Sequence, residues 1–162
     1  MNDTLNQRLE KADVAKFVPH AGKMLLLSRI VRHSVEERML VSEVDIAAND
    51  LFYDETLKGV PVWVGFEYMA QSISALSGIY NRHLDIPPRV GFIVSVSGYK
   101  ANAAAFAPGT TVSVKVHETM RIESDVMFTC EIKCGETVLA TGMLNALEVD
   151  DPQKIKRELN HG

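Results

Sequence analysis

The stretch from Gly59 to Tyr80, GVPVWVGFEYMAQSISALSGIY, constrains the fold more than any other part of the 162-residue chain. Beyond Pro61 its apolar side chains would occupy nearly every face of a helix, and Glu67 is its single acidic residue. A helix that is apolar nearly all round needs cover on most of its surface. We therefore expect the rest of the chain to wrap around this segment.

The chain after this helix changes to a period-two pattern that is typical of strands. Short turns, APGT, ESD and CGET, separate the alternating segments, so we expect four consecutive antiparallel neighbours. These segments are residues 90–101, 110–122, 125–134 and 137–149. With an earlier strand pair, residues 25–33 and 38–46, the pattern predicts an α+β fold: one long central helix wrapped by a curved antiparallel sheet of about six strands.

The length of the chain is that of a single domain. We assign residues 1–162 to one domain, with an N-terminal helical segment over residues 1–18 and a C-terminal tail over residues 150–162. Within the first segment, residues 9–17 predict a short helix that ends before Pro19.

The composition excludes several classes of protein. The polar N-terminus lacks the basic start and apolar run of a signal peptide, so we expect a cytoplasmic protein with no membrane span. A net charge of −4 argues against a nucleic-acid surface. Cys130 and Cys134 would lie about 13 Å apart on one face of a strand, too far to form a disulfide. We interpret both as inert thiols and expect no metal site.

Three stretches resemble the hot-dog-fold dehydratases that act on 3-hydroxyacyl groups carried by acyl carrier protein in fatty-acid synthesis. VPHAGKMLLLSRI is similar to the Pro-His entry to the first strand of that family, and GFEYMAQS to its helix motif of Glu followed by Met-Ala-Gln. VGFIVSVSGYKANAAAFAPGT is similar to its third strand and Pro-Gly turn. The resemblance implies a hot-dog fold.

The loop before the helix departs from the family pattern. In the family a loop His within His-Phe-Pro-Gly works with the helix Glu, whereas residues 49–63, NDLFYDETLKGVPVW, contain no His. The chain resembles more closely a branch that lacks this His and includes proteins associated with aryl-polyene clusters.

Dehydration of a 3-hydroxyacyl thioester needs a base for the C2 proton and an acid for the departing hydroxyl. The resemblance implies that Glu67 is the acid, and apolar surroundings favour the protonated form of a carboxyl group. His20, which follows Pro19, lies in the segment that the resemblance puts beside the acyl tunnel, so we interpret it as the replacement base. A His20 that fixes the bend through the backbone, and a Glu67 that is exposed or neutralised by Arg29, remain the structural alternatives.

Three further residues are predicted to bind substrate. Val62 aligns with the helix Gly whose backbone N–H contacts the thioester oxygen in the family. Gln71 lies one turn after Glu67 on a ridge of polar or small residues, and Tyr53 occupies the loop where the family has its His. No metal or redox cofactor is implied. We interpret His33 and the other remaining histidines as structural or solvent-facing.

We interpret the chain as a dehydratase of 3-hydroxyacyl thioesters on acyl carrier protein, in fatty-acid or polyene-type synthesis. The resemblance implies a homodimer and allows hetero-association with a second dehydratase. Two alternatives remain open at this point. One is a hot-dog acyl thioesterase, which needs no His; the other is a non-catalytic acyl-binding subunit that completes an active dehydratase.

Overall fold

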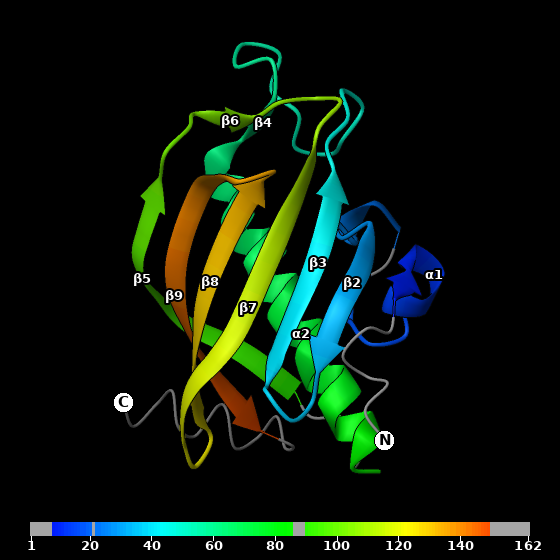
Figure 1. The fold of residues 1–162 in the computed structure, drawn as a ribbon, viewed down its shortest axis with the longest axis vertical. Coiled ribbons are helices and arrows are strands. Elements are labelled where there is room, and N and C mark those ends of the chain that lie inside the picture. The colour runs from blue at the N-terminus through cyan, green and yellow to red at the C-terminus, as the bar shows by residue number, and fades with distance from the viewer. Residues whose placement is uncertain (1–7, 21, 86–89, 150–162) are drawn as a thin grey trace.

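A curved antiparallel sheet wraps around one long helix in the computed structural model, which describes residues 8–20, 22–85 and 90–149 (Figure 1). The described sheet has the strand order β1-β2-β3-β7-β8-β9-β5. Its strands are β1 (Leu9–Glu10), β2 (Arg29–Ser34), β3 (Met39–Asp45), β5 (Val90–Ala101), β7 (Thr111–Ile122), β8 (Asp125–Cys134) and β9 (Thr137–Val149). This architecture confirms the predicted fold class.

The helix α2 (Gly65–His83) lies along the concave face of the sheet, after a single 3-10 turn at Val62–Val64 (Figure 1). Alternate residues of β7 point toward it, and Val112, Val114 and Val116 are fully buried. Two buried serines of this core are paired, because the Ser72 hydroxyl bonds both the Ser42 hydroxyl and the Tyr68 carbonyl at 2.8 Å. The apolar surface of the predicted helix is therefore covered as its sequence requires.

The start of α2 is held against the sheet at a glycine. A Cβ atom added at Gly65 would lie 2.5 Å from the Tyr99 hydroxyl oxygen and 2.7 Å from Ile132 Cδ1. Only a residue without a side chain lets the helix approach so closely. The Tyr99 hydroxyl donates a hydrogen bond of 2.6 Å to the Val62 carbonyl, which fixes the same turn.

The expectation of four consecutive neighbouring strands is wrong for β5. It pairs with β9 rather than with β7, so the chain crosses from one side of the sheet to the other between them. The crossing runs through β6 (Ala105–Phe106), which pairs with β4 (Val60–Pro61) just before α2. Because β6 has a partner there, the Pro-Gly turn at residues 107–110 ends a crossover and not a hairpin.

The predicted N-terminal helix is also shorter than expected. Leu9 and Glu10 form β1, paired with β2, and only α1 (Lys11–Val14) is helical. Residues 25–28, predicted as the start of the first strand, precede β2 and belong to no strand. The C-terminal tail and residues 1–7 lie outside the described residues, so those parts of the domain assignment stay predictions.

A network of charged side chains ties the C-terminal half of α2 to the sheet. Arg38, in the β2–β3 turn, lies 4.0 Å from the centroid of the Tyr80 ring and donates to its hydroxyl at 2.8 Å. Arg38 and Arg121 both bond Glu118, and Arg121 also bonds Glu148 at 3.1 Å. Both carboxylates raise the pKa of the Arg121 guanidinium. We call these five residues the Glu118–Glu148 network.

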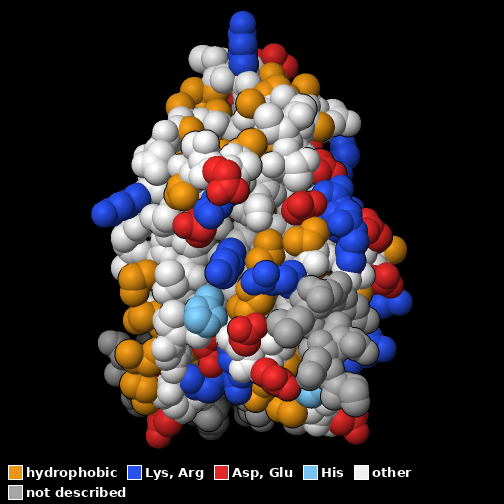
Figure 2. Space-filling model, viewed as in Figure 1, with side chains coloured by type: hydrophobic (Ala, Val, Ile, Leu, Met, Phe, Trp, Pro, Cys, Tyr) orange, Lys and Arg blue, Asp and Glu red, His pale blue; other side chains and the backbone are white. Residues whose placement is uncertain are grey.

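The outer surface carries charges of both signs. Figure 2 shows Lys and Arg side chains interspersed with Asp and Glu over the face in view, consistent with a net charge of only −4. Among the helices in the described part of the chain, none has the length and apolar character needed to cross a membrane.

Candidate active site

Glu67 lies in the first turn of α2, at the surface rather than within the core. Its side chain keeps 37% of its area exposed, so the single chain does not enclose the carboxyl group as fully as its apolar neighbours in sequence suggest. Phe66 and Ala70, also on α2, are partly buried against the core, while Glu67 faces the N-terminal segment.

The structure brings His20 and Glu67 together. The Nε2 atom of His20 lies 3.4 Å from Oε2 of Glu67, somewhat beyond the usual length of a hydrogen bond. The other ring nitrogen, Nδ1, is buried and has no hydrogen-bond partner among the described residues. One imidazole nitrogen and one carboxyl oxygen therefore face each other, which is the geometry of an acid–base pair.

The segment that carries His20 packs along α2 because the helix leaves room for it. A Cβ atom at Gly78 would lie 2.6 Å from the Phe17 carbonyl oxygen, so glycine at this position lets the Phe17 backbone rest on the helix. The chain then continues through Pro19 to His20 and reaches Glu67, which lies about three turns before Gly78 on the same helix face. This contact places the predicted ridge beneath the N-terminal segment.

Gln71 joins the same segment to the helix and is 1% exposed. Its Oε1 accepts a hydrogen bond of 2.9 Å from the Leu26 N–H, and its Nε2 donates to the Met24 carbonyl at 2.8 Å. Nε2 also donates to Glu67 Oε2 at 3.2 Å, the oxygen that faces His20. The Gln71 amide therefore holds Glu67 and residues 24–26 in place, and contact between Gln71 and substrate stays a prediction.

Both backbone groups of Val62 have hydrogen-bond partners within the chain. Its N–H group donates to the Ala104 carbonyl at 3.0 Å, next to the pairing between β4 and β6, and contact between this N–H and a thioester oxygen stays a prediction. Its carbonyl accepts from Tyr99, whose pKa burial raises to about 12. The N–H of Val62 therefore bonds the residue just before β6, and its carbonyl bonds the Tyr99 side chain of β5.

Asp50 and Asp54 accept the hydrogen bonds that shape the loop in which the family has its His. The Asp54 carboxylate accepts bonds from the Thr56 and Leu57 N–H groups, at 2.8 and 3.0 Å, and so caps a turn. The Tyr53 N–H donates to the Asp50 carbonyl at 3.1 Å, and the Tyr53 side chain is half-buried. Contact between Tyr53 and substrate stays a prediction.

Arg29 does not neutralise Glu67. Its guanidinium bonds Glu43 at 2.8 Å and also bonds Asp45, and it lies 3.8 Å from Glu10. The bond with Arg29 is the main reason that the pKa of Asp45 is lowered. The structural alternative in which Arg29 occupies the Glu67 carboxylate is therefore excluded.

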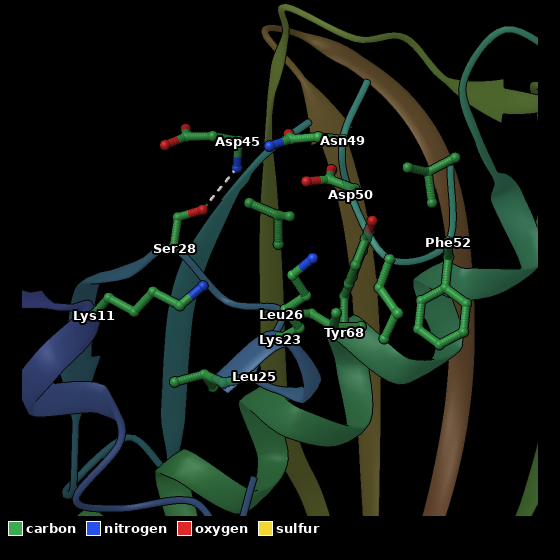
Figure 3. Close-up of a pocket in the computed structure, with 13 residues that line it drawn as sticks. Lys11, Lys23, Leu25, Leu26, Ser28, Asp45, Asn49, Asp50, Phe52 and Tyr68 are labelled. Carbon is green, nitrogen blue, oxygen red and sulfur yellow. Dashed lines mark hydrogen bonds between the residues drawn. The ribbon is translucent and has the colours of Figure 1, made fainter. Parts of the chain in front are cut away.

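A pocket of about 210 Å³ lies beside this site, between the segment before β2, the loop after β3 and the first turn of α2 (Figure 3). Neither His20 nor Glu67 lines it. Its apolar wall includes Leu25, Val60 and Phe52, and its polar lining includes Lys11. Sequence reasoning missed it, because its lining comes from separate segments that no local pattern connects.

Among the remaining chemically active side chains, His33 and Cys130 are buried. Both ring nitrogens of His33 lack partners among the described residues, and burial lowers the pKa of this His. Burial raises the pKa of the Cys130 thiol to about 12, and both cysteines are free. Within residues 8–20, 22–85 and 90–149, no three His, Cys, Asp or Glu side chains are grouped to hold a metal ion.

Comparison with known proteins gives matches of two kinds. The sequence model of the ApeP-like family, described as ApeP dehydratase, matches residues 12–157. The curated protein 3-hydroxyacyl-(acyl-carrier-protein) dehydratase FabZ of Francisella tularensis subsp. novicida (strain U112) is 31% identical over 74 residues, 44% of this chain. That match spans 45% of the length of FabZ, less than half of the curated relative.

Solved structures share the fold. The dehydratase heterocomplex ApeI:P from Xenorhabdus doucetiae has a TM-score of 0.80 at 23% identity, over 91% of this chain and 97% of that chain. A hypothetical thioesterase with coenzyme A from Streptococcus pneumoniae TIGR4 has a TM-score of 0.57 at 8% identity, over 71% of this chain and 81% of that chain. The resemblance to hot-dog dehydratases is confirmed, and because the family model covers residues 12–157, this protein belongs to the ApeP-like dehydratase family.

Proposed function

We propose that this protein removes water from 3-hydroxyacyl thioesters carried on acyl carrier protein. The observation that carries the proposal is the 3.4 Å approach of His20 Nε2 to Glu67 Oε2 in a chain whose loop lacks the usual His. Membership of the ApeP-like dehydratase family and the partial match to FabZ support the same reaction class.

The proposed reaction uses the two side chains as base and acid. Neutral His20 accepts the proton from C2 of the acyl group, and protonated Glu67 donates its proton to the hydroxyl leaving C3. The C2–C3 double bond forms and water departs, leaving an imidazolium and a carboxylate. Because the two atoms lie 3.4 Å apart without substrate, the proton can return from His20 to Glu67 and restore the starting state.

The pair is accessible to a substrate in the single chain. Side-chain exposure is 28% for His20 and 37% for Glu67, which leaves a face open to a thioester and to a partner subunit. Strand β5 is an edge strand of the described sheet, where it pairs only with β9. We propose that a second subunit, either another copy or a second dehydratase, pairs along β5 and covers the site.

The test is turnover of a 3-hydroxyacyl group on acyl carrier protein, followed by mass spectrometry of the loss of water. Removing a general acid or base typically costs about 10²- to 10⁴-fold in rate. We expect Glu67→Gln and His20→Gln each to lower the turnover rate at least about 100-fold and to keep the melting temperature of the wild type. Wild-type turnover by Glu67→Gln would refute the proposed acid.

A non-catalytic subunit is the second candidate, favoured by the loop without His and by the similarity to a component of the ApeI:P heterocomplex. It predicts that the isolated protein acts on no thioester but increases the turnover of a partner dehydratase. A thioesterase, the weaker alternative, predicts release of free thiol that His20→Ala leaves unchanged. The same set of assays therefore separates all three functions.

A further inference from the structure

We infer that Trp63 binds the pantetheine arm of the thioester substrate, the flexible link between the acyl group and its carrier. The inference rests on the proposed dehydration, because it takes Glu67 as the reacting group, and it names the part of the substrate that Trp63 recognises. Three observations carry it: the exposure of Trp63, the rigidity of its turn, and the single open direction along α2 from Glu67.

Trp63 is 65% exposed, more than any other large apolar residue that the structure describes. It is also the single tryptophan of the chain. Its indole N–H has no acceptor among the described residues, so the ring and its hydrogen-bond donor are both free to contact a ligand. Because tryptophan is highly buried on average, an exposure this large favours a ligand or a partner that covers the ring.

The turn that carries Trp63 is held in one conformation. The preceding residue, Val62, bonds Ala104 through its N–H at 3.0 Å and Tyr99 through its carbonyl at 2.6 Å. The Phe52 ring packs edge-on against the Trp63 ring, with the ring centroids 6.3 Å apart and an interplanar angle of 67°. A ring that is already held in place loses little conformational freedom when a ligand binds, which favours recognition.

Trp63 and Glu67 are neighbours at the start of the helix. The 3-10 turn at Val62–Val64 leads directly into α2, and residues four apart on a helix lie on one side of it, about 6 Å apart along its axis. The Glu67 side chain is 37% exposed on this side, whereas Tyr68 and Met69, which face the core, are at most 2% exposed. A chain that runs from Glu67 toward the first residue of the helix therefore passes over Trp63.

The opposite direction along the helix is covered by the chain itself. The Phe17 backbone rests on Gly78, where an added Cβ atom would lie 2.6 Å from the Phe17 carbonyl oxygen, and His20 lies 3.4 Å from Glu67. The segment between Phe17 and His20 thus covers α2 on the C-terminal side of Glu67. Since the carrier protein must remain outside, the arm leaves past Trp63, at the end of the molecule where β4 and β6 lie (Figure 1).

The chemistry of the arm suits this surface. Pantetheine is a neutral chain in which amide groups separate short apolar stretches, so it needs an apolar surface with few hydrogen bonds and no charge. The indole of Trp63 provides the apolar surface and one N–H donor for an amide carbonyl. We therefore expect Trp63 to recognise the handle of the substrate and not its acyl group.

Turnover of two thioesters separates recognition of the arm from recognition of the acyl group. 3-Hydroxyhexanoyl-pantetheine contains the arm, and the S-methyl thioester of 3-hydroxyhexanoate has the same acyl group without it. We expect Trp63→Ala to lower kcat/KM for the pantetheine thioester about 3- to 10-fold, through KM, as for the loss of one aromatic contact. KM for the S-methyl thioester should stay that of the wild type, and Trp63→Phe should restore most of the loss.

Binding without turnover tests the inference separately from the dehydration. Hexanoyl-pantetheine has no 3-hydroxyl group and cannot lose water, and its binding should change Trp63 emission in a saturable way, without interference from another tryptophan. The S-methyl thioester of hexanoate should leave the emission unchanged at the same concentrations. A saturable change in a protein that dehydrates nothing would refute the proposed function and keep the arm site, whereas dehydration without any change in emission would refute the arm site alone.

Leu84→Ala is the matched control, because it removes another exposed apolar side chain, 49% exposed, just beyond the far end of α2. It should leave the kinetics of both thioesters unchanged. Wild-type kinetics of Trp63→Ala with the pantetheine thioester would overturn the inference. Equal losses for both thioesters would also overturn it and assign the ring to a subunit contact, which native mass spectrometry of the variant would show as an altered assembly.

Discussion

Replacement of Gln71 by Met tests whether this side chain holds residues 24–26, just before β2, against α2. Met has a similar length and fits a buried site, but it provides neither the amide donor nor the acceptor. The substitution removes the bonds to the Leu26 N–H, the Met24 carbonyl and Glu67 Oε2. The segment that carries His20 would then keep its packing and lose its polar attachment.

The magnitude follows from what each freed group can do next. Leu26 is half-buried, so its N–H is left without a partner, at about 1–3 kcal/mol. Met24 is 55% exposed as a residue, so we expect water to replace the lost bond at its carbonyl, at a cost closer to about 1 kcal/mol. We expect the free energy of unfolding to fall by about 3 kcal/mol and the melting temperature by roughly 6–12 °C for a chain of this size.

Urea unfolding gives the free energy, and hydrogen exchange at the Leu26 amide reports the local attachment. This amide should be protected in the wild type and exchange much faster in Gln71→Met. Ser74→Ala, one turn further along the same helix, is the control, and we expect a change within about 0.5 kcal/mol. If Gln71→Met has the unfolding free energy of the wild type and protects the Leu26 amide equally, the hydrogen bonds of Gln71 do not stabilise the fold and the reasoning fails.

Three further outcomes follow from the buried groups. Burial lowers the pKa of His33, so the folded state favours the neutral ring. The free energy of unfolding should therefore decrease as the pH falls below about 6.5. His33→Leu should make that decrease smaller, as measured by urea unfolding across the pH range. Gly65→Ala should destabilise the fold by about 1–3 kcal/mol, because its Cβ displaces the anchored Tyr99 hydroxyl, and Tyr99→Phe should lessen the effect of the alanine in a double-mutant cycle. A thiol reagent should modify the partly exposed Cys134 well before the buried Cys130, and equal rates would contradict the burial of Cys130.

The strands were predictable because alternation and short turns are local signals. The limits predicted for residues 90–101, 125–134 and 137–149 coincide with β5, β8 and β9. The partner of β5 was not predictable in the same way, because it depends on the path of residues 102–110 over the helix start. Pairing of β6 with β4 is a contact between distant segments, and no pattern within either segment announces it.

The candidate site was predictable in its residue types and less so in their contacts. The Pro-His and Glu-containing stretches pointed to His20 and Glu67, which the fold brings to 3.4 Å. The occupation of the Val62 N–H by Ala104 could not be seen, because it requires the three-dimensional course of the crossover. The role of Gln71 was missed for the same reason, since a ridge of polar residues gives no information about which backbone will cover it.

The Glu118–Glu148 network has a consequence for how this sequence can vary. Arg38 and Arg121 share Glu118, whose side chain is only 12% exposed, so replacing either arginine alone leaves a poorly hydrated carboxylate with half of its compensation. Loss of one partner from such a cluster is far more costly than exchange of the whole cluster for apolar side chains. We therefore expect related sequences to change these positions together, so that the residue at one position predicts the residues at the others.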